Sequence, residues 1–170
     1  MPACGALSNG NTYSISFVDI DGNKLSTADG HVTIVVLTTS ADREQARTVG
    51  DHVPDFCLGN PAYRMITVIH FTGGYIVLGR RVATAFIQLR VREEAKRLQT
   101  RYDARKISRD AKNDIFVAAD FDGTAASQLG QPAGAMDFCV FVFGRKGELL
   151  AQWHSVPSVD ELTAALKKSG

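Results

Sequence analysis

The feature that most constrains the fold is an apolar run that passes directly into the start of a helix. Residues 32–37 read Val-Thr-Ile-Val-Val-Leu, which is typical of a central strand covered on both faces. Thr39 and Asp42 follow with the spacing of a capping box, and an acid in the first turn suits the positive end of a helix dipole. We therefore predict a buried strand followed by a helix over about residues 41–51.

Apolar periodicity and turn residues predict the other elements. Alternation over residues 13–19 and the turn residues Asp21-Gly22-Asn23 favour a small hairpin, and a second capping box at Ser158 and Glu161 opens a closing helix. The remaining predicted elements are a long helix over residues 82–105 and strands over 65–71, 114–120, 138–143 and 148–153. Strands separated by helices, followed by a hairpin and a terminal helix, predict an α/β sandwich with a mixed sheet.

The 170 residues suit one domain, which we place at residues 12–170 after a flexible tail over residues 1–11. A net charge of +1 with 45% hydrophobic residues predicts neither a nucleic-acid nor a membrane partner. No apolar run approaches the roughly 18 residues that span a bilayer. The long helix has a basic face, which we interpret as solvated, and an apolar stripe through which a homodimer could form.

The chain has three cysteines, Cys4, Cys57 and Cys139, which is an odd number at wide spacing. They form no Cys-x-x-Cys pair and no metal-ligand pattern with the four histidines, so we predict reduced thiols and neither a metal nor a cofactor. The first residues show neither the charged nor the apolar region of a signal peptide. A cytoplasmic location is the default prediction, with export after removal of a leader as the alternative.

The order of these elements resembles the thioredoxin-like superfamily, in particular its peroxiredoxin-like and thiol-disulfide oxidoreductase branch, over about residues 13–166. The similarity rests on four segments: the leading hairpin, the strand and helix start at 32–44, the strand, acidic turn and short helix at 116–130, and the closing hairpin Phe-Val-Phe-Gly-Arg-Lys-Gly-Glu-Leu at 141–149. The resemblance implies a three-layer sandwich with a mixed central sheet and an N-terminal β-hairpin.

Two positions depart from the pattern of this superfamily. Its redox cysteine lies at the start of the helix after the first core strand, where this chain reads Thr-Thr-Ser-Ala-Asp-Arg over residues 38–43. Its cis-proline lies just before the first strand of the closing hairpin, where this chain reads Ala-Met-Asp-Phe-Cys over residues 135–139. Without these two parts of the site, the resemblance implies a redox-inactive member that acts by binding.

The candidate binding residues are those at the predicted helix start, Thr39, Ser40, Asp42 and Arg43, because amides there can hold a carboxylate or a phosphate. The predicted partner is a protein or a small anionic ligand. His70 and His154 have no serine or cysteine partner in a recognisable motif, so we predict structural or surface roles for them.

An alternative is a non-standard thiol oxidoreductase or peroxidase. It would use Cys57, which lies in a Pro/Gly-rich loop, as the catalytic thiol and Cys139 as its resolving partner. Against it, Cys139 alternates with apolar residues inside a predicted core strand, and a free cysteine is usually a buried, inert residue.

A third hypothesis rests on residues 115–124, which resemble the first motif of haloacid-dehalogenase-type phosphatases, an apolar strand ending in Asp-x-Asp-Gly-Thr. In that family the first aspartate, here Asp120, forms an aspartyl-phosphate, and the second, here Asp122, is the general acid. That motif normally opens its domain, whereas here it lies in the last third of the chain. A thioredoxin-like strand followed by an acidic turn accounts for the same residues.

Overall fold

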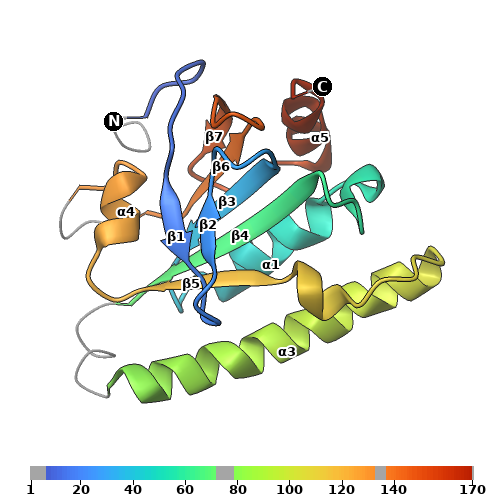
Figure 1. The fold of residues 1–170 in the computed structure, drawn as a ribbon, viewed down its shortest axis with the longest axis horizontal. Coiled ribbons are helices and arrows are strands. Elements are labelled where there is room, and N and C mark those ends of the chain that lie inside the picture. The colour runs from blue at the N-terminus through green and yellow to red at the C-terminus, as the bar shows by residue number, and fades with distance from the viewer. Residues whose placement is uncertain (1–6, 72–78, 133–136, 170) are drawn as a thin grey trace.

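The computed structural model describes residues 7–71, 79–132 and 137–169. Its main sheet has five strands: β3 (Val32–Thr38), β4 (Tyr63–His70), β5 (Phe116–Asp120), β6 (Cys139–Phe143) and β7 (Leu149–Trp153). They lie in the order β5-β4-β3-β6-β7 (Figure 1). β3, β4 and β5 are parallel, whereas β6 is antiparallel to β3 and β7 is antiparallel to β6. The predicted mixed sheet is confirmed.

The helices and the hairpin flank this sheet. Among the described residues the α-helices are α1 (Arg43–His52), α3 (Arg80–Ala104), α4 (Thr124–Gln128) and α5 (Val159–Lys167), and the hairpin pairs β1 (Ser16–Val18) with β2 (Lys24–Ser26). The capping box predicted for the last helix is confirmed, because Ser158 Oγ accepts from the backbone N–H of Glu161 and the Glu161 carboxylate accepts from that of Ser158.

Each face of the sheet has its own apolar core. On one face, Val35 and Phe141 pack with Phe17 of the hairpin and with residues of α4. On the other, Ile34 and Val36 pack with residues of α1 and α5. β3 and β6 are buried along their whole length because both of their faces are covered. The chain therefore has the three layers that the sequence predicts, with β1 and β2 in front of the sheet and α1 behind it (Figure 1).

The described part of the predicted N-terminal tail is attached to β7. Leu7 is buried, and its carbonyl accepts from the side chain of Gln152 at 3.0 Å. The backbone N–H of Gly10 donates to Leu149 O at 2.8 Å, and that of Leu149 donates to Asn11 O at 2.9 Å. Residues 7–11 thus continue the hydrogen bonding of the sheet, while residues 1–6 of the predicted tail lie outside the described residues.

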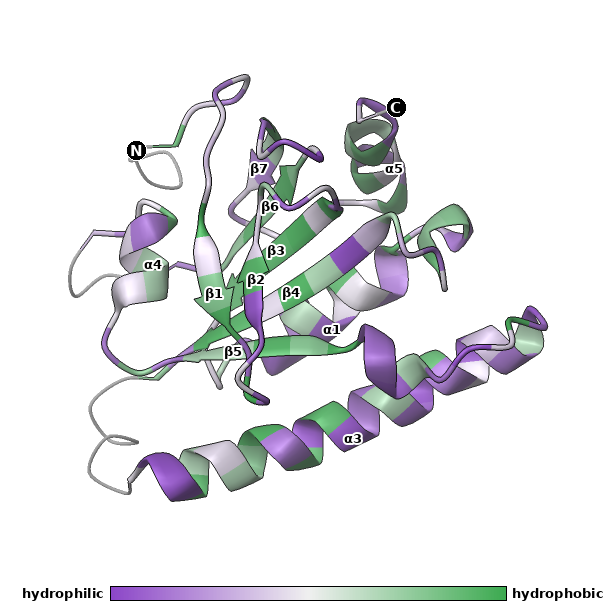
Figure 2. Cartoon of the chain, in the orientation of Figure 1, coloured by the Kyte–Doolittle hydropathy of each residue, from purple (hydrophilic) through white to green (hydrophobic). Residues whose placement is uncertain are grey.

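The long helix α3 carries polar and apolar residues intermixed along its length (Figure 2). The sequence predicts that the basic residues of this helix face solvent. Several of them instead contact α1 and the turn after it. Arg97 binds both oxygens of Asp51, Arg101 donates to the carbonyls of Gly50 and Val53, and Arg105 binds Asp55. Ion pairs and hydrogen bonds from arginine side chains of α3 therefore form much of its packing against α1 and the turn after it.

Three large apolar side chains of α3, namely Val82, Phe86 and Leu89, are exposed on the single chain. They are spaced by four and three residues, so they share one side of the helix. A homodimer through this stripe stays a prediction. None of the helices in the described ranges has the length and apolar character that crossing a membrane requires.

Asp29, which follows the hairpin, binds a buried arginine of β4. Arg64 donates to its two oxygens at 3.0 Å each, and His31 Nδ1 lies 2.8 Å from Oδ1. Burial raises the pKa of Asp29, but the hydrogen bonds from His31 and Arg64 outweigh burial and lower it from 3.8 to about 2. The ionised form is therefore the form that the folded chain prefers.

This pKa predicts a loss of stability in acid. A carboxyl group whose pKa is lowered on folding contributes its stabilisation above its unfolded pKa of 3.8, and the contribution is lost as the pH falls toward about 2. We expect the D29N variant to be less stable than the wild type at pH 5, and the difference to shrink as the pH falls to about 2.5. Urea unfolding of both proteins across this range measures it. A difference that stays constant with pH would contradict the assigned role of Asp29.

Candidate functional site

The predicted binding residues lie where β3 ends and α1 begins. Because β3, β4 and β5 are parallel, their carboxyl ends meet at one edge of the sheet, which is where ligands bind in many α/β proteins. Thr39 and Ser40 are half-buried at this edge, and Asp42 directly precedes α1. Thr39 Oγ1 donates to Asp42 Oδ2 at 3.2 Å, and the Gln45 amide donates to Oδ1 at 3.1 Å.

The capping box predicted from Thr39 and Asp42 is wrong. α1 begins at Arg43, so Asp42 is itself the N-cap residue, and its side chain accepts from two other side chains instead of from a backbone N–H of the helix. Asp42 thus leaves the N–H groups of the first turn uncapped. Such groups carry a partial positive charge and favour a nearby anion.

Arg43, the fourth predicted residue, extends to the long helix. It forms an ion pair with Glu93 of α3, and one turn later Arg47 Nε donates to Glu94 Oε1 at 3.0 Å. Arg43 Nε is buried and has no hydrogen-bond partner in the described part of the chain. The start of α1 is therefore held against α3 by two pairs of opposite charges.

His70 and Asp120, which no sequence motif links, lie side by side at the same edge of the sheet. His70 ends β4 opposite Asp120 at the end of β5, and His70 Nδ1 lies 2.9 Å from Asp120 Oδ2. Because an ionised carboxylate only accepts hydrogen bonds, Nδ1 carries the hydrogen in this pair. Each residue ends an apolar run, but only the strand order, with β4 beside β5, places them side by side.

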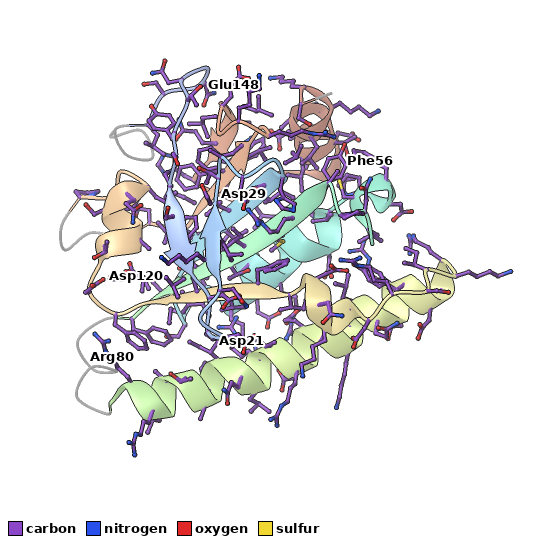
Figure 3. All side chains as sticks on the ribbon, viewed as in Figure 1. Asp21, Asp29, Phe56, Arg80, Asp120 and Glu148 are labelled. Carbon is purple, nitrogen blue, oxygen red and sulfur yellow. The ribbon has the colours of Figure 1, made fainter. Side chains whose placement is uncertain are left out.

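Asp120 also holds the start of α4. Its carboxylate is 3% exposed and accepts from the backbone N–H groups of Ala125 at 3.2 Å and Ala126 at 3.1 Å. Figure 3 places it at the end of β5 that leads to α4. The exposed Asp122 instead accepts from the backbone N–H of Thr124 at 3.0 Å, which lowers the pKa of Asp122. These contacts give Asp120 a structural role, and none of them supports the phosphatase hypothesis.

The structure does not bring Cys57 and Cys139 together. Cys139 begins β6 beside Leu37, near the carboxyl end of β3, whereas Cys57 lies in the turn that leads to the opposite end of the sheet, where β4 begins. Cys57 is a free thiol, and burial raises its pKa to about 12. Cys139 is disulfide-bonded, which corrects the prediction that all thiols are reduced.

Residues 135 and 136, which begin the stretch compared with the cis-proline site, lie outside the described residues. His154, for which a structural or surface role is predicted, lies near the buried Cys139, with Nδ1 3.9 Å from Sγ.

No protein-family model matches the chain, and no curated protein matches it in sequence. Its fold does match solved structures. The exposed lipoprotein thioredoxin of Streptococcus pneumoniae is 13% identical, with a TM-score of 0.56 over 92% of this chain and 99% of that one. A peroxiredoxin-like protein from Aquifex aeolicus is 17% identical, with a TM-score of 0.55 over 96% and 88% of the two chains. A DsbF homologue from Corynebacterium diphtheriae is 10% identical, with a TM-score of 0.53 over 92% and 85%.

Proposed function

We propose that this chain, whose fold is thioredoxin-like, is redox-inactive and acts by binding another molecule. The observation that carries the proposal is the sequence at the junction of β3 and α1. A redox-active member of the superfamily is expected to hold its reactive cysteine there, and this chain holds residues Thr39–Arg43 without a thiol. The scaffold that positions such a site is present, since β3 is fully buried and leads into α1.

The chemistry of Cys57 supports the proposal. A thiolate, and not a thiol, attacks disulfides and peroxides. With a pKa of about 12, Cys57 is almost entirely a thiol at neutral pH. Cys139 lies at the other end of the sheet and is not its disulfide partner. A redox cycle between these two cysteines would therefore need both a lower pKa and a large rearrangement.

The junction of β3 and α1 suits an anionic group of a partner. The first-turn amides of α1 are not capped by the side chain of Asp42, and the guanidinium of Arg43, although paired with Glu93, has an Nε with no hydrogen-bond partner in the described part of the chain. The carboxylate of Asp42, which would repel an anion, is held by Thr39 and Gln45. We therefore propose a protein carboxylate or a small anion as the group bound at Thr39, Ser40, Asp42 and Arg43.

The test compares the full chain with a C57S variant and with an active thioredoxin. We expect neither form of this chain to reduce insulin disulfides or consume peroxide above background. We also expect iodoacetamide at pH 7 to label Cys57 on the order of a thousandfold more slowly than an unperturbed thiol, because so little of it is thiolate, and to label it readily once the chain is unfolded in urea. Mass spectrometry of the Cys57 peptide gives both rates.

Turnover comparable to that of the active thioredoxin would overturn the proposal. If that turnover were lost in C57S, Cys57 would be the catalytic thiol, as the alternative hypothesis holds. If it persisted in C57S, the reaction would depend on another cysteine of the chain, such as the disulfide-bonded Cys139.

A further inference from the structure

A mainly apolar cavity of about 180 Å³ lies between the sheet and the two helices α1 and α3. Strands β3, β4 and β5 form its floor, and α3 forms one wall. The cavity is larger than the roughly 150 Å³ that suffices to hold a benzene ring in an engineered protein core. The apolar side chains that line it include Ile34, Met65, Ile69, Val91, Leu98 and Val117.

Arg90 of α3 lines this cavity and is only 8% exposed. Arg64 lines it too and is equally buried, but its guanidinium is paired with Asp29. Its Nη1 is buried without a hydrogen-bond partner in the described residues. Burial and the nearby Arg43 lower the pKa of Arg90, yet an arginine stays charged in any protein environment. The guanidinium also lies 6.0 Å from the centroid of the Phe86 ring, and this cation–π contact leaves Nη1 without an acceptor in the described part of the chain. A buried charged donor without an acceptor is costly, so it favours an anion that reaches it.

The neighbouring acids are already engaged. Glu93 binds Arg43, and Glu94 binds Arg47 at 3.0 Å. With Arg43 and Arg47 paired in this way, Arg90 offers one unneutralised charge above an apolar floor. One charge beside an apolar volume suits a monoanion with an apolar body. It does not suit a phosphate, which carries more charge and needs several donors.

We infer that this cavity is a binding site for a small amphipathic carboxylate, with the carboxylate on Arg90 Nη1 and an alkyl chain or a ring of about six to eight carbons against the apolar floor. The cavity lies under α3, and none of residues 39–43 at the junction of β3 and α1 lines it. The inference goes beyond the proposed function, because a chain that proved redox-active would still have this cavity, and a chain that bound no carboxylate could still be redox-inactive.

Octanoate is the first probe, and octanol is its uncharged match. We expect isothermal titration calorimetry to show saturable binding of octanoate to the full chain, and much weaker binding of octanol. In R90M, which keeps an apolar stem of similar length, octanoate should bind about tenfold to a hundredfold more weakly, because a hydrogen bond to a charged group is lost. R92M is the matched control, since Arg92 is exposed on the same helix, and its affinity should equal that of the wild type.

A second measurement places the ligand and does not depend on R90M folding. Methyl NMR should show octanoate shifting the resonances of Ile34 and Met65, which line the cavity, and leaving the exposed Val18 unchanged. L98W should fill the cavity and abolish these shifts, with circular dichroism reporting that the variant is folded.

Three outcomes would each overturn the inference. They are the absence of saturable octanoate binding to the wild type, equal affinity for octanoate and octanol, and a folded R90M variant that binds octanoate as the wild type does. Shifts confined to the junction of β3 and α1 would also overturn it, because they would move the anion site to that surface.

Discussion

Replacement of Asp120 by alanine should lower the free energy of unfolding by about 3 kcal/mol, because it leaves several buried donors without an acceptor. The donors are His70 Nδ1 and the backbone N–H groups of Ala125 and Ala126. These three groups come from β4 and α4, so the loss should also loosen the start of α4. Urea unfolding monitored by circular dichroism gives the stability, and hydrogen exchange of the Ala126 amide reports the local effect.

The matched control is D122A, which removes an exposed carboxylate two residues away. We expect it to affect stability far less, because Asp122 accepts its hydrogen bond at the surface. Equal losses in D120A and D122A would contradict the structural role of Asp120. Magnesium-dependent hydrolysis of a phosphate ester that disappears in a folded D120N variant would instead favour the phosphatase hypothesis.

Gly147→Ala should destabilise the chain by about 3 kcal/mol or more. Gly147 lies in the turn between β6 and β7 with φ +88°, a conformation that side chains disfavour. A Cβ there would also collide with the backbone carbonyl of Tyr13, and Tyr13 donates its own N–H to Gly147 O at 2.8 Å. The methyl group would therefore force the N-terminal segment away from this turn. Thermal and urea unfolding measure the loss.

The Gly22→Ala variant separates the strain of a positive φ from the collision with Tyr13. Gly22 has φ +84°, close to that of Gly147, but nothing lies within 4 Å of the position of its Cβ. Its replacement should cost only the backbone strain, about 1 kcal/mol. If the two variants were equally stable, the collision with Tyr13 would contribute nothing, and the close packing of the N-terminal segment on this turn would be in doubt.

The strands were predictable because their signal is local. β3 and β6 are continuous apolar runs, and both are buried along their whole length, as such runs predict. The start of α1 was not predicted correctly. Thr39 and Asp42 both suit an N-cap position, and the choice between them depends on side-chain partners such as Gln45. The order of the elements was enough to predict the thioredoxin-like fold.

The contacts between distant residues could not be predicted in the same way. His70 and Asp120 are separated by fifty residues and meet only because β4 and β5 are neighbours. Arg90 counts as part of a basic helical face in the sequence, and its burial depends on how α3 lies over the sheet. Both features require the strand order and the helix placement, which hydrophobic periodicity does not contain.

The attachment of residues 7–11 to β7 has a consequence for how the chain reaches its native state. The hydrogen bond between Leu7 O and Gln152 spans 145 positions. Closing so long a loop is entropically costly until the intervening strands have assembled. During synthesis the β6–β7 hairpin is made late, after most of the sheet. Residues 7–11 must therefore wait until β7 has been synthesised before they acquire these partners.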